Sequence, residues 1–285
     1  MINKKIHILT LSYNGEKLLQ KLRKGLADNL NYITMENGSI KHGWDYPEWY
    51  IRDNGSKDNT IEEINSWKYD SNILLSTTVF PVNHNRDNFS KGVNYLFEKA
   101  KPKDDDLILL LNNDIEFNDY ESLNNMINLL TKDVGIVGAR LLYPGTNKLQ
   151  HAGVIFSERY GNMPYHYRHG EESDSNSCKN RYFQAVTAAC CIFKASDFRR
   201  AGYLNEDLWW AFEDIFFALM VGREKKIAYC GQTNISHGES KTLKLNPVNK
   251  MFLQQNVKKF KDAWLGKYEI DHDKYLKDPD YNLIK

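Results

Sequence analysis

The stretch Leu107-Ile108-Leu109-Leu110-Leu111-Asn112-Asn113-Asp114 decides the fold class. Its five apolar residues leave no polar face, which is typical of a central strand in a mostly parallel sheet that helices cover on both sides. The three polar residues follow where the strand ends, and α/β sheets bind their ligands at the carboxyl ends of their strands. The stretch therefore predicts both an α/β sheet and a ligand site at its edge.

Segments typical of strands and helices alternate around this stretch. Apolar runs predict strands at 6–11, 48–52 and 74–82, and helical patterns follow them at 16–30, 58–67 and 90–99. Residues 31–48 break the alternation with Asn37-Gly38, Gly43 and Pro47, and we expect a loop or an insertion there. The alternation over residues 6–140 predicts a Rossmann-like, doubly wound half that binds a nucleotide.

The rest of the chain predicts a second, smaller half and a tail. Strands are expected at 134–142, 150–156, 182–193 and 227–230, with a polar excursion at 157–180 and a helix at 214–221. No repeat or low-complexity linker separates the halves, so we expect one domain over 1–245, divided at about residue 140. Residues 246–285 have helical spacing (Met251, Val257, Phe260, Trp264) and are expected to pack back on the body.

Composition excludes several classes of protein. The 285 residues carry a net charge of +1, which gives no global field toward nucleic acid and argues against a nucleic-acid partner. The basic runs 223–226 and 258–261 fit either a solvated helix face or a weak attraction to anionic lipid headgroups or a polyanionic acceptor. The four cysteines, which include Cys190 and Cys191, lack metal or redox spacing and are expected to be buried thiols.

The sequence also bears on location. The N-terminus runs into a short apolar strand and not into a secretory signal, and no stretch approaches 18 apolar residues. We therefore expect a cytoplasmic protein without a transmembrane segment. A peripheral contact with the cytosolic face of a membrane stays open, and the sequence gives no oligomeric state.

Two carboxylates at predicted strand ends are candidates for ligand binding. Asp114, at the end of the central strand, could hold Mg²⁺ or Mn²⁺ together with phosphate oxygens of a substrate. Asp53, in Asp53-Asn54-Gly55-Ser56-Lys57-Asp58, could accept a hydrogen bond from the N–H of a uracil or thymine ring. The structural alternative is a turn, which Asn and Asp favour, with Asp58 or Asn59 capping the next helix.

Two further segments carry titratable side chains. Glu213-Asp214 lies in the aromatic stretch Trp209-Trp210-Ala211-Phe212-Glu213-Asp214-Ile215-Phe216-Phe217, and an apolar setting raises a carboxyl pKa as a general base requires. Asp214 could instead cap the helix that follows. His237 could ligate a metal, although a lone histidine is more often structural, and the same structural interpretation covers His151.

Taken together, these segments resemble glycosyltransferase family 2, the GT-A-fold transferases that use nucleotide-diphosphate sugars. The resemblance runs from Ile6 to about Ser240. Leu11-Ser12-Tyr13-Asn14 looks like the family's first-strand segment, and residues 53–60 are close to its Asp-Asn-Gly-Ser-x-Asp-x-Thr. Phe89-Ser90-Lys91-Gly92-Val93-Asn94 is similar to its Gly/Asn-rich helix start, and Asn112-Asn113-Asp114 stands where the family has Asp-x-Asp. Glu213-Asp214 matches the family's Glu-Asp pair, and His237 matches its C-terminal histidine.

The resemblance implies a role for each of these segments. Asp214, with Glu213, is expected to supply the catalytic base, and Asp114 and His237 are expected to bind Mn²⁺ or Mg²⁺. The donor, a UDP- or dTDP-sugar, is expected to contact Thr10, Ser12, Tyr13, Asn14, Asp53, Ser56, Arg86, Lys91, Asn112 and Asn113. Trp209, Trp210 and Thr187 are expected on the acceptor side, although core packing would equally explain the tryptophans. The segments 150–154 and 185–190 look most like rhamnosyltransferase-type enzymes of cell-surface polysaccharide assembly.

Two departures from the family pattern concern the donor site. Arg86 and Asn88 stand where many relatives have Asn and Gly, and the link at 31–48 looks longer than usual. The expected reaction is an inverting single displacement onto a hydroxyl of a glycan or lipid-linked glycan. The alternatives are a nucleotidyltransferase, which would want a basic, Gly-rich phosphate loop near the N-terminus, and a non-catalytic sugar-binding module. A dehydrogenase lacks its Gly-x-Gly-x-x-Gly motif here.

Overall fold

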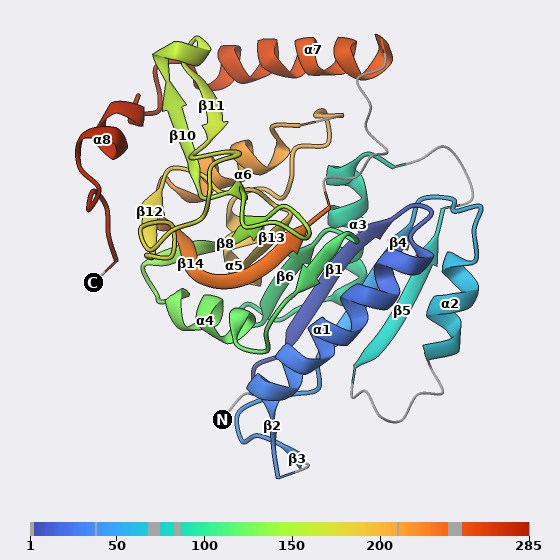
Figure 1. Cartoon of the computed structure of the whole chain (residues 1–285). Coiled ribbons are helices and arrows are strands. Elements are labelled where there is room, and N and C mark those ends of the chain that lie inside the picture. The colour runs from blue at the N-terminus through green and yellow to red at the C-terminus, as the bar shows by residue number, and fades with distance from the viewer. Residues whose placement is uncertain are drawn as a thin grey trace.

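The computed structural model describes residues 3–37, 39–67, 75–82, 87–209, 211–238 and 247–284. Its main feature is one ten-stranded sheet with helices on both faces (Figure 1). The strand order along its main path is β12-β14-β8-β13-β6-β1-β4-β5, with β7 paired to β14 and β9 paired to β8. Four of the seven neighbouring pairs on this path are parallel, so the expected mostly parallel α/β sheet is confirmed.

The N-terminal half follows the predicted alternation closely. Its sheet strands are β1 (Ile6–Ser12), β4 (Glu48–Asp53), β5 (Ser76–Pro81) and β6 (Leu107–Leu111). Its helices are α1 (Glu16–Thr34), α2 (Thr60–Ser66) and α3 (Phe89–Ala100). Strand β1 pairs in parallel with both β4 and β6, so three polar strand ends meet at one edge. Leu74, the first residue of the strand expected at 74–82, lies outside the described residues.

Strand β6 is buried on both of its faces, as its apolar run predicts. Ile108 and Leu110 belong to the core cluster under α3, α5 (Ala195–Arg200) and α6 (Glu213–Val221). Leu107, Leu109 and Leu111 belong to the cluster under α1, α2 and α4 (Ser122–Leu129). The strand therefore has no face that could meet solvent.

The second half joins the first through an antiparallel strand. Its sheet strands are β7 (Ile115–Phe117), β8 (Val134–Leu142), β9 (Leu149–His151), β12 (Arg181–Phe183), β13 (Cys190–Lys194) and β14 (Lys226–His237). Strand β13 lies antiparallel between β6 and β8. The segment that leads into β13 therefore reaches the same edge of the sheet at which β6 ends.

Four predicted boundaries differ from the structure. Residues 31–48 are not only loop, because α1 continues to Thr34 and is followed by the small hairpin β2 (Met35–Glu36) and β3 (Ser39–Ile40). The single strand expected at 182–193 is two strands, β12 and β13, joined by a non-strand segment at 184–189. The strand expected at 227–230 continues to His237, so this histidine lies in β14 and not after it.

The fourth difference is a break at Gly153 in the strand expected at 150–156. The chain ends β9 at His151 and begins β10 (Val154–Ser157) after a glycine whose φ is +104°. A Cβ atom at this position would lie 2.4 Å from the Phe183 ring. Both the backbone conformation and the close approach of Phe183 therefore require glycine here.

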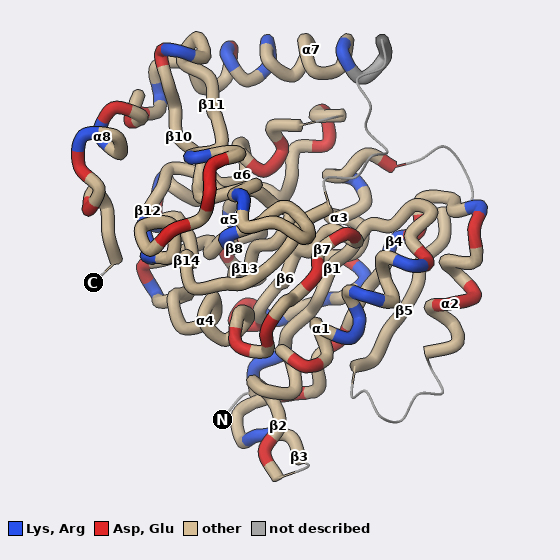
Figure 2. Tube along the Cα trace, in the orientation of Figure 1, with Lys and Arg blue, Asp and Glu red and all other residues tan. Residues whose placement is uncertain are grey.

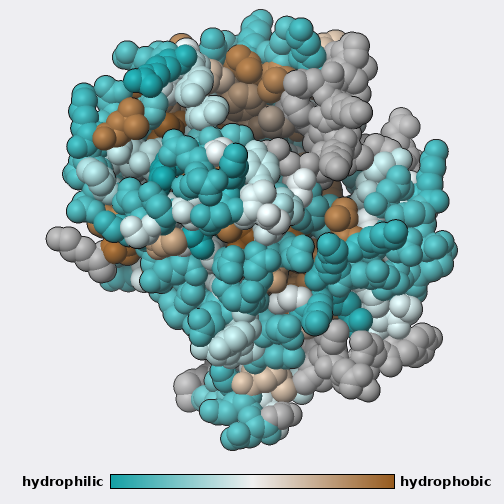
Figure 3. Space-filling view, viewed as in Figure 1, coloured by the Kyte–Doolittle hydropathy of each residue, from teal (hydrophilic) through white to brown (hydrophobic). Residues whose placement is uncertain are grey.

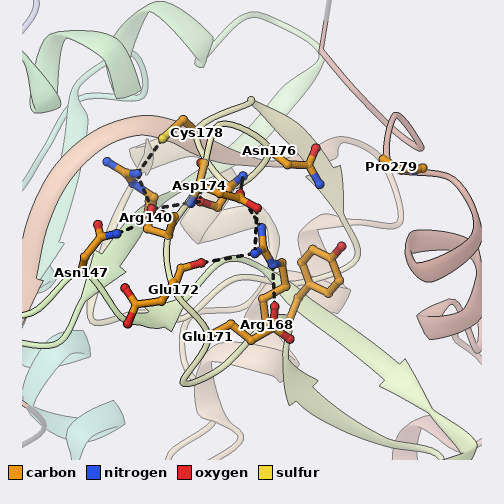
Figure 4. A network of polar contacts seen from close by, with 12 residues as sticks. Arg140, Asn147, Arg168, Glu171, Glu172, Asp174, Asn176, Cys178 and Pro279 are labelled. Atoms are coloured by element: carbon orange, nitrogen blue, oxygen red, sulfur yellow. Dashed lines mark hydrogen bonds and ion pairs between the residues drawn. The ribbon is translucent and has the colours of Figure 1, made fainter.

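The polar excursion at 157–180 is ordered by two arginines, of which Arg140 joins it to the sheet and Arg168 bonds within it (Figure 4). It contains the short 3₁₀ turn η2 (Glu158–Tyr160) and β11 (Met163–His166), which pairs with β10 as a hairpin. Arg140 donates from Nη1 to Ser173 Oγ (2.8 Å) and from Nη2 to the Thr233 carbonyl (2.7 Å). Arg168 donates to Glu171 and Asp174. A segment that looks like a loop in the sequence is thus ordered by charge-assisted hydrogen bonds.

The C-terminal tail packs on the body through aromatic rings. Helix α7 (Pro247–Trp264) places Phe260, which is fully buried, against the rings of Phe156 and Phe212. After α7 the Asp271 N–H donates a hydrogen bond to the Phe156 carbonyl (3.1 Å), and the Phe156 N–H donates one to Asp271 Oδ1 (2.8 Å). The last helix is α8 (His272–Lys277).

The surface fits the near-neutral net charge. Acidic and basic residues are interspersed along the chain (Figure 2), and the view of Figure 3 is mostly hydrophilic, with hydrophobic residues gathered at the top near α7. The exposed large apolar side chains of the tail are Met251, Leu265, Ile270 and Leu276. Among the helices that the structure describes, none is both long enough and apolar enough to cross a membrane.

Replacing Phe260 by Ala should lower the free energy of unfolding by about 3–5 kcal/mol, because it leaves a cavity between tail and body. Equilibrium unfolding in urea measures the change. The matched control is Leu265→Ala, whose side chain is exposed and whose loss should change stability by less than about 0.5 kcal/mol. Equal stability of the two variants would contradict this packing.

Candidate functional site

The ends of β1, β4 and β6 meet in one polar edge. Ser12 and Asp53 are register partners at the ends of β1 and β4, and the Asn54 N–H donates to the Ser12 carbonyl (2.8 Å). From the end of β6, Asn113 donates through Nδ2 to Ser12 Oγ (3.2 Å). The structure therefore brings together the ends of three neighbouring strands, including the two strand-end segments, around Asp53 and Asp114, that the sequence singled out.

The loop after β4 is ordered by the side chain of Asp53. Its carboxylate accepts hydrogen bonds from the Gly55 N–H (3.1 Å), the Ser56 N–H (3.0 Å) and the Ser56 hydroxyl, and the residue is fully buried. The turn interpretation thus accounts for these bonds. The contact between Asp53 and a nucleotide base stays a prediction.

The turn after β1 interlocks with this loop. The Asn14 N–H donates to Ser56 Oγ (2.8 Å), and Asn14 Oδ1 accepts from the Lys57 N–H (2.8 Å). Asp58 accepts from the first N–H groups of both α1 and α2, at Glu16 and Thr60. The loops after β1 and after β4, which are far apart in the sequence, are therefore hydrogen-bonded into one surface at the strand ends.

The remaining residues predicted for the nucleotide lie at different depths. Tyr13 is half-buried, and Lys91 is exposed in the first turn of α3. Asn88 caps that helix, because its Oδ1 accepts from the Lys91 N–H (2.8 Å). Thr10 is fully buried, and its hydroxyl accepts from Trp49 Nε1 (2.9 Å), so its nucleotide contact stays a prediction. Arg86 and Trp210 lie outside the described residues.

Asp114 and His237 form the second group of the site. Strand β7 pairs antiparallel with the end of β14, which sets Ile115 opposite His237 and brings Asp114 beside the imidazole. Asp114 Oδ1 lies 3.2 Å from His237 Nε2, and Asn112 Nδ2 lies 3.1 Å from the same nitrogen. Both side chains are nearly buried, so two metal-type ligands converge at the end of the central strand.

This pair fits part of a divalent cation site. Two atoms bound to one Mn²⁺ or Mg²⁺ at about 2.1 Å in cis positions lie roughly 3 Å apart, which is close to the separation seen here. Within the described residues no group of three or more His, Cys, Asp or Glu side chains could hold a metal. Oxygen atoms of a substrate and water would therefore have to complete the coordination of any metal bound by Asp114 and His237.

Glu213 and Asp214 open helix α6 after two residues in an unusual conformation. Ala211 and Phe212 have φ values of +65° and +74°, which are costly for residues with side chains. The Ala211 carbonyl accepts from Asn256 Nδ2 of α7 (3.1 Å), and the Phe212 ring packs on Phe260. The tail thus holds the strained turn that aims the acid pair.

The surroundings of the acid pair favour protonation. Burial raises the pKa of both Glu213 and Asp214, and the neighbouring Asp214 charge raises the pKa of Glu213 further. Asp214 is partly compensated, because its carboxylate accepts from the N–H groups of Ala188 (3.3 Å) and Ile215 (2.8 Å). Among the described residues Glu213 Oε2 is buried without a hydrogen-bond partner, so of the two carboxyl groups Glu213 takes up a proton more readily than Asp214.

The segment 187–189 connects the two halves of the site. The Ala188 N–H donates to Asp214 Oδ2, and the carbonyl of the next residue, Ala189, accepts from the Asn112 N–H (2.9 Å). The acid pair and the group around Asp114 are therefore joined through two consecutive residues of one backbone segment.

The residues predicted on the acceptor side divide between surface and interior. Trp209 is 44% exposed and stacks on Phe252 of α7. The Thr187 N–H donates to His151 Nε2 (3.4 Å), and His151 Nδ1 lies 2.8 Å from His166 Nδ1. Sequence reasoning missed His166. Its signal was weak, because His166 and His151 come together only through a hairpin that the sequence did not predict.

Comparisons with solved structures show the fold class. S. aureus TarS 1–349, solved with UDP-GlcNAc, superposes with a TM-score of 0.59 at 13% identity, over 94% of this chain and 69% of that one. The mannosyltransferase PcManGT from Pyrobaculum calidifontis, solved with GDP-Man and Mn²⁺, gives 0.60 at 12% identity, over 97% and 70%. The chain has the architecture of the GT-A glycosyltransferases.

Sequence comparison then shows the family. Residues 8–201 match the family described as Glycosyl transferase family 2, which is more than half of the chain. The chain belongs to this family. It is 29% identical over 157 residues to the O-antigen biosynthesis protein RfbC of Myxococcus xanthus, and 28% identical over 221 residues to "Uncharacterized protein y4gI" of Sinorhizobium fredii. The match to RfbC covers 52% of this chain and 12% of that protein, and the match to y4gI covers 75% of this chain and 21% of that protein. The chain therefore spans only a small part of the length of either relative.

Replacing Asp214 by Asn should stabilise the folded protein at pH 8, by on the order of 1 kcal/mol. The native pKa is raised above the ordinary value of 3.8, so ionisation disfavours folding increasingly as the pH rises above 3.8, and the gain should vanish below about pH 3, where both states are protonated. Urea unfolding at several pH values measures this, with the exposed Asp207→Asn as the control. Destabilisation that is equal at every pH would contradict the assigned environment.

Proposed function

We propose that the chain is an inverting glycosyltransferase that moves a sugar from a UDP- or dTDP-sugar to a hydroxyl of a glycan or glycolipid. Family membership supports the transferase class. The observation that carries the finer proposal is the 187–189 segment, which joins a buried acid pair to the Asp114–His237 pair. A base for the attacking hydroxyl and a charge-stabilising group for the leaving diphosphate are thereby held by one backbone.

In this proposal Asp214 is the catalytic base. It accepts the proton of the acceptor hydroxyl while the oxygen forms a bond to the anomeric carbon, and the bond from that carbon to the diphosphate oxygen breaks with its electron pair. The two N–H groups from Ala188 and Ile215 keep Asp214 ionised more readily than Glu213. Inversion follows because attack and departure take place on opposite faces of the sugar.

Asp114 and His237 are assigned to a divalent cation, Mn²⁺ or Mg²⁺. When bound, such a cation would neutralise the charge that develops on the leaving diphosphate. Asn112 lies beside this pair, with its Nδ2 3.1 Å from His237 Nε2. GT-A structures similar to this chain were solved with UDP-GlcNAc, with GDP-Man and Mn²⁺, and with UDP, GalNAc and Mn²⁺, which supports a nucleotide donor and a metal.

The acceptor is proposed to be a glycan from the assembly of a surface polysaccharide, either free or linked to a lipid. The similarity to an O-antigen biosynthesis protein supports this class. For a lipid-linked acceptor the enzyme would work at the cytoplasmic face of a membrane. Helix α7 supports a peripheral contact there, because it exposes Met251 together with Lys258 and Lys261.

A panel of nucleotide sugars tests the donor. UDP-glucose, UDP-GlcNAc, dTDP-rhamnose and GDP-mannose are each added with and without Mn²⁺, and the melting temperature is recorded. We expect at least one UDP- or dTDP-sugar to stabilise the protein in a way that depends on Mn²⁺, and Asp114→Ala to remove this dependence. Stabilisation that is independent of metal would indicate a binding module and would contradict the metal assignment.

The variant Asp214→Asn tests the base. With the donor that the panel identifies, hydrolysis or transfer should fall by about 10²–10⁴-fold because no group accepts the proton. The affinity for the nucleotide should stay within twofold, since Asp214 makes no contact with it in the proposal. Asp207→Asn, on the exposed part of the same loop, should keep wild-type turnover. Preserved turnover in Asp214→Asn would overturn the assignment.

A further inference from the structure

Two histidines that the proposed mechanism does not use form a pair beside the site. His151, at the end of β9, is fully buried, and its Nδ1 lies 2.8 Å from Nδ1 of His166, at the end of β11. On its other side His151 Nε2 faces the Thr187 N–H at 3.4 Å. His166 is only partly buried. The pair therefore runs from the segment next to the acid pair toward an accessible ring.

The contacts determine where the protons lie. A backbone N–H can only donate, so His151 Nε2 accepts from Thr187 and a neutral His151 carries its proton on Nδ1. That proton is donated to His166 Nδ1, which leaves the proton of a neutral His166 on Nε2. Both rings are neutral at pH 7, because burial lowers the pKa of His166 to about 4 and that of His151 well below its usual range. The arrangement thus presents one N–H donor, at His166 Nε2.

The pair lies close to both parts of the site. The imidazole of His237 is near enough that its charge would lower the pKa of His151 and of His166. Thr187, which contacts His151, also donates from its side chain to Asp214. In the proposed reaction the transferred sugar has to lie between Asp214 and the proposed cation site at Asp114 and His237. Its anomeric carbon is bonded to the diphosphate at that site and is attacked by the hydroxyl that Asp214 deprotonates.

We propose that His166 Nε2 donates a hydrogen bond to a hydroxyl of the sugar carried by the nucleotide, and that His151 fixes its tautomer. The inference rests on the proposed function and adds a residue that determines sugar binding. A neutral N–H suits a sugar hydroxyl, whereas an imidazolium would also attract the diphosphate. His166 would therefore contribute to the affinity for the sugar and not to that for the bare nucleotide.

The hairpin that carries His166 is well supported. At its far end the Tyr268 hydroxyl donates to the Asn162 carbonyl (2.5 Å), and Ser157 Oγ lies 2.8 Å from His272 Nδ1. Between them Asp271 binds the backbone of Phe156. A hydrogen-bond donor on a fixed element loses little entropy when the substrate binds, which favours its use in recognition.

The test compares each nucleotide sugar with its own nucleotide. Dissociation constants are measured by calorimetry with Mn²⁺ for UDP and UDP-GlcNAc, UDP and UDP-glucose, dTDP and dTDP-rhamnose, and GDP and GDP-mannose. In His166→Ala the preference for the sugar that wild type binds best should fall about tenfold, while the affinity for the nucleotide stays within twofold. His42→Ala is the control, because that side chain is exposed in the turn after β3 and should leave the preference unchanged.

The outcomes separate this inference from the proposed function. If wild type binds no nucleotide or nucleotide sugar of the panel, the proposed function fails and the inference fails with it. If wild type binds but His166→Ala keeps the preference for the sugar, only the inference is overturned. A second measurement does not depend on a substrate. Nitrogen-15 NMR of labelled histidines at pH 7 should show His166 protonated on Nε2 and His151 on Nδ1, and the reverse tautomers would overturn the inference.

Discussion

The burial of β6 on both faces is the constraint on which the rest of the structure depends. Its five apolar residues can be satisfied only between two helical layers, which places the strand in the middle of the sheet. Its end is then the centre of the ligand-binding edge. Because β13 pairs antiparallel with β6, the segment that enters β13 begins where β6 ends, and Ala189 binds Asn112 there. The antiparallel pairing of β13 thus brings the 187–189 segment, whose Ala188 N–H donates to Asp214, to the strand end.

Much of the fold, and the polar strand ends that form the candidate site, could be predicted from local pattern. Strand β6 carries an uninterrupted apolar run and β1 and β4 carry shorter ones, and polar, turn-forming residues follow all three, so the pattern predicts both the strands and their polar ends. The break at Gly153 was not, because it depends on the Phe183 ring, which is distant in the sequence. The extension of β14 to His237 likewise depends on pairing with β7, a contact that no local pattern encodes.

For the candidate site, too, the sequence indicated residue types in local segments but not the contacts between distant segments. Asp114 Oδ1 and His237 Nε2 lie 3.2 Å apart, which the proposed metal role requires, although the separation of the two residues in the chain gave no sign of this distance. Asp53 is compatible with both the turn interpretation and the predicted nucleotide contact, since the turn that it orders lies at the strand ends where the ring of a nucleotide could bind. His166 could not be found from sequence, because its chemical character comes from His151, which fixes its tautomer from across a hairpin.

The tail explains how such a site can stay ordered. Strain at Ala211 and Phe212 and the burial of two carboxyl groups both disfavour the conformation that the acid pair needs. Phe260 packs on Phe212 and also on Phe156 in the hairpin that carries His166, so one buried ring supports both the proposed base and the proposed sugar contact. Large apolar burial is the usual means of offsetting such local costs. The tail is therefore part of the site's architecture, because the strained turn and the hairpin share it as their common support.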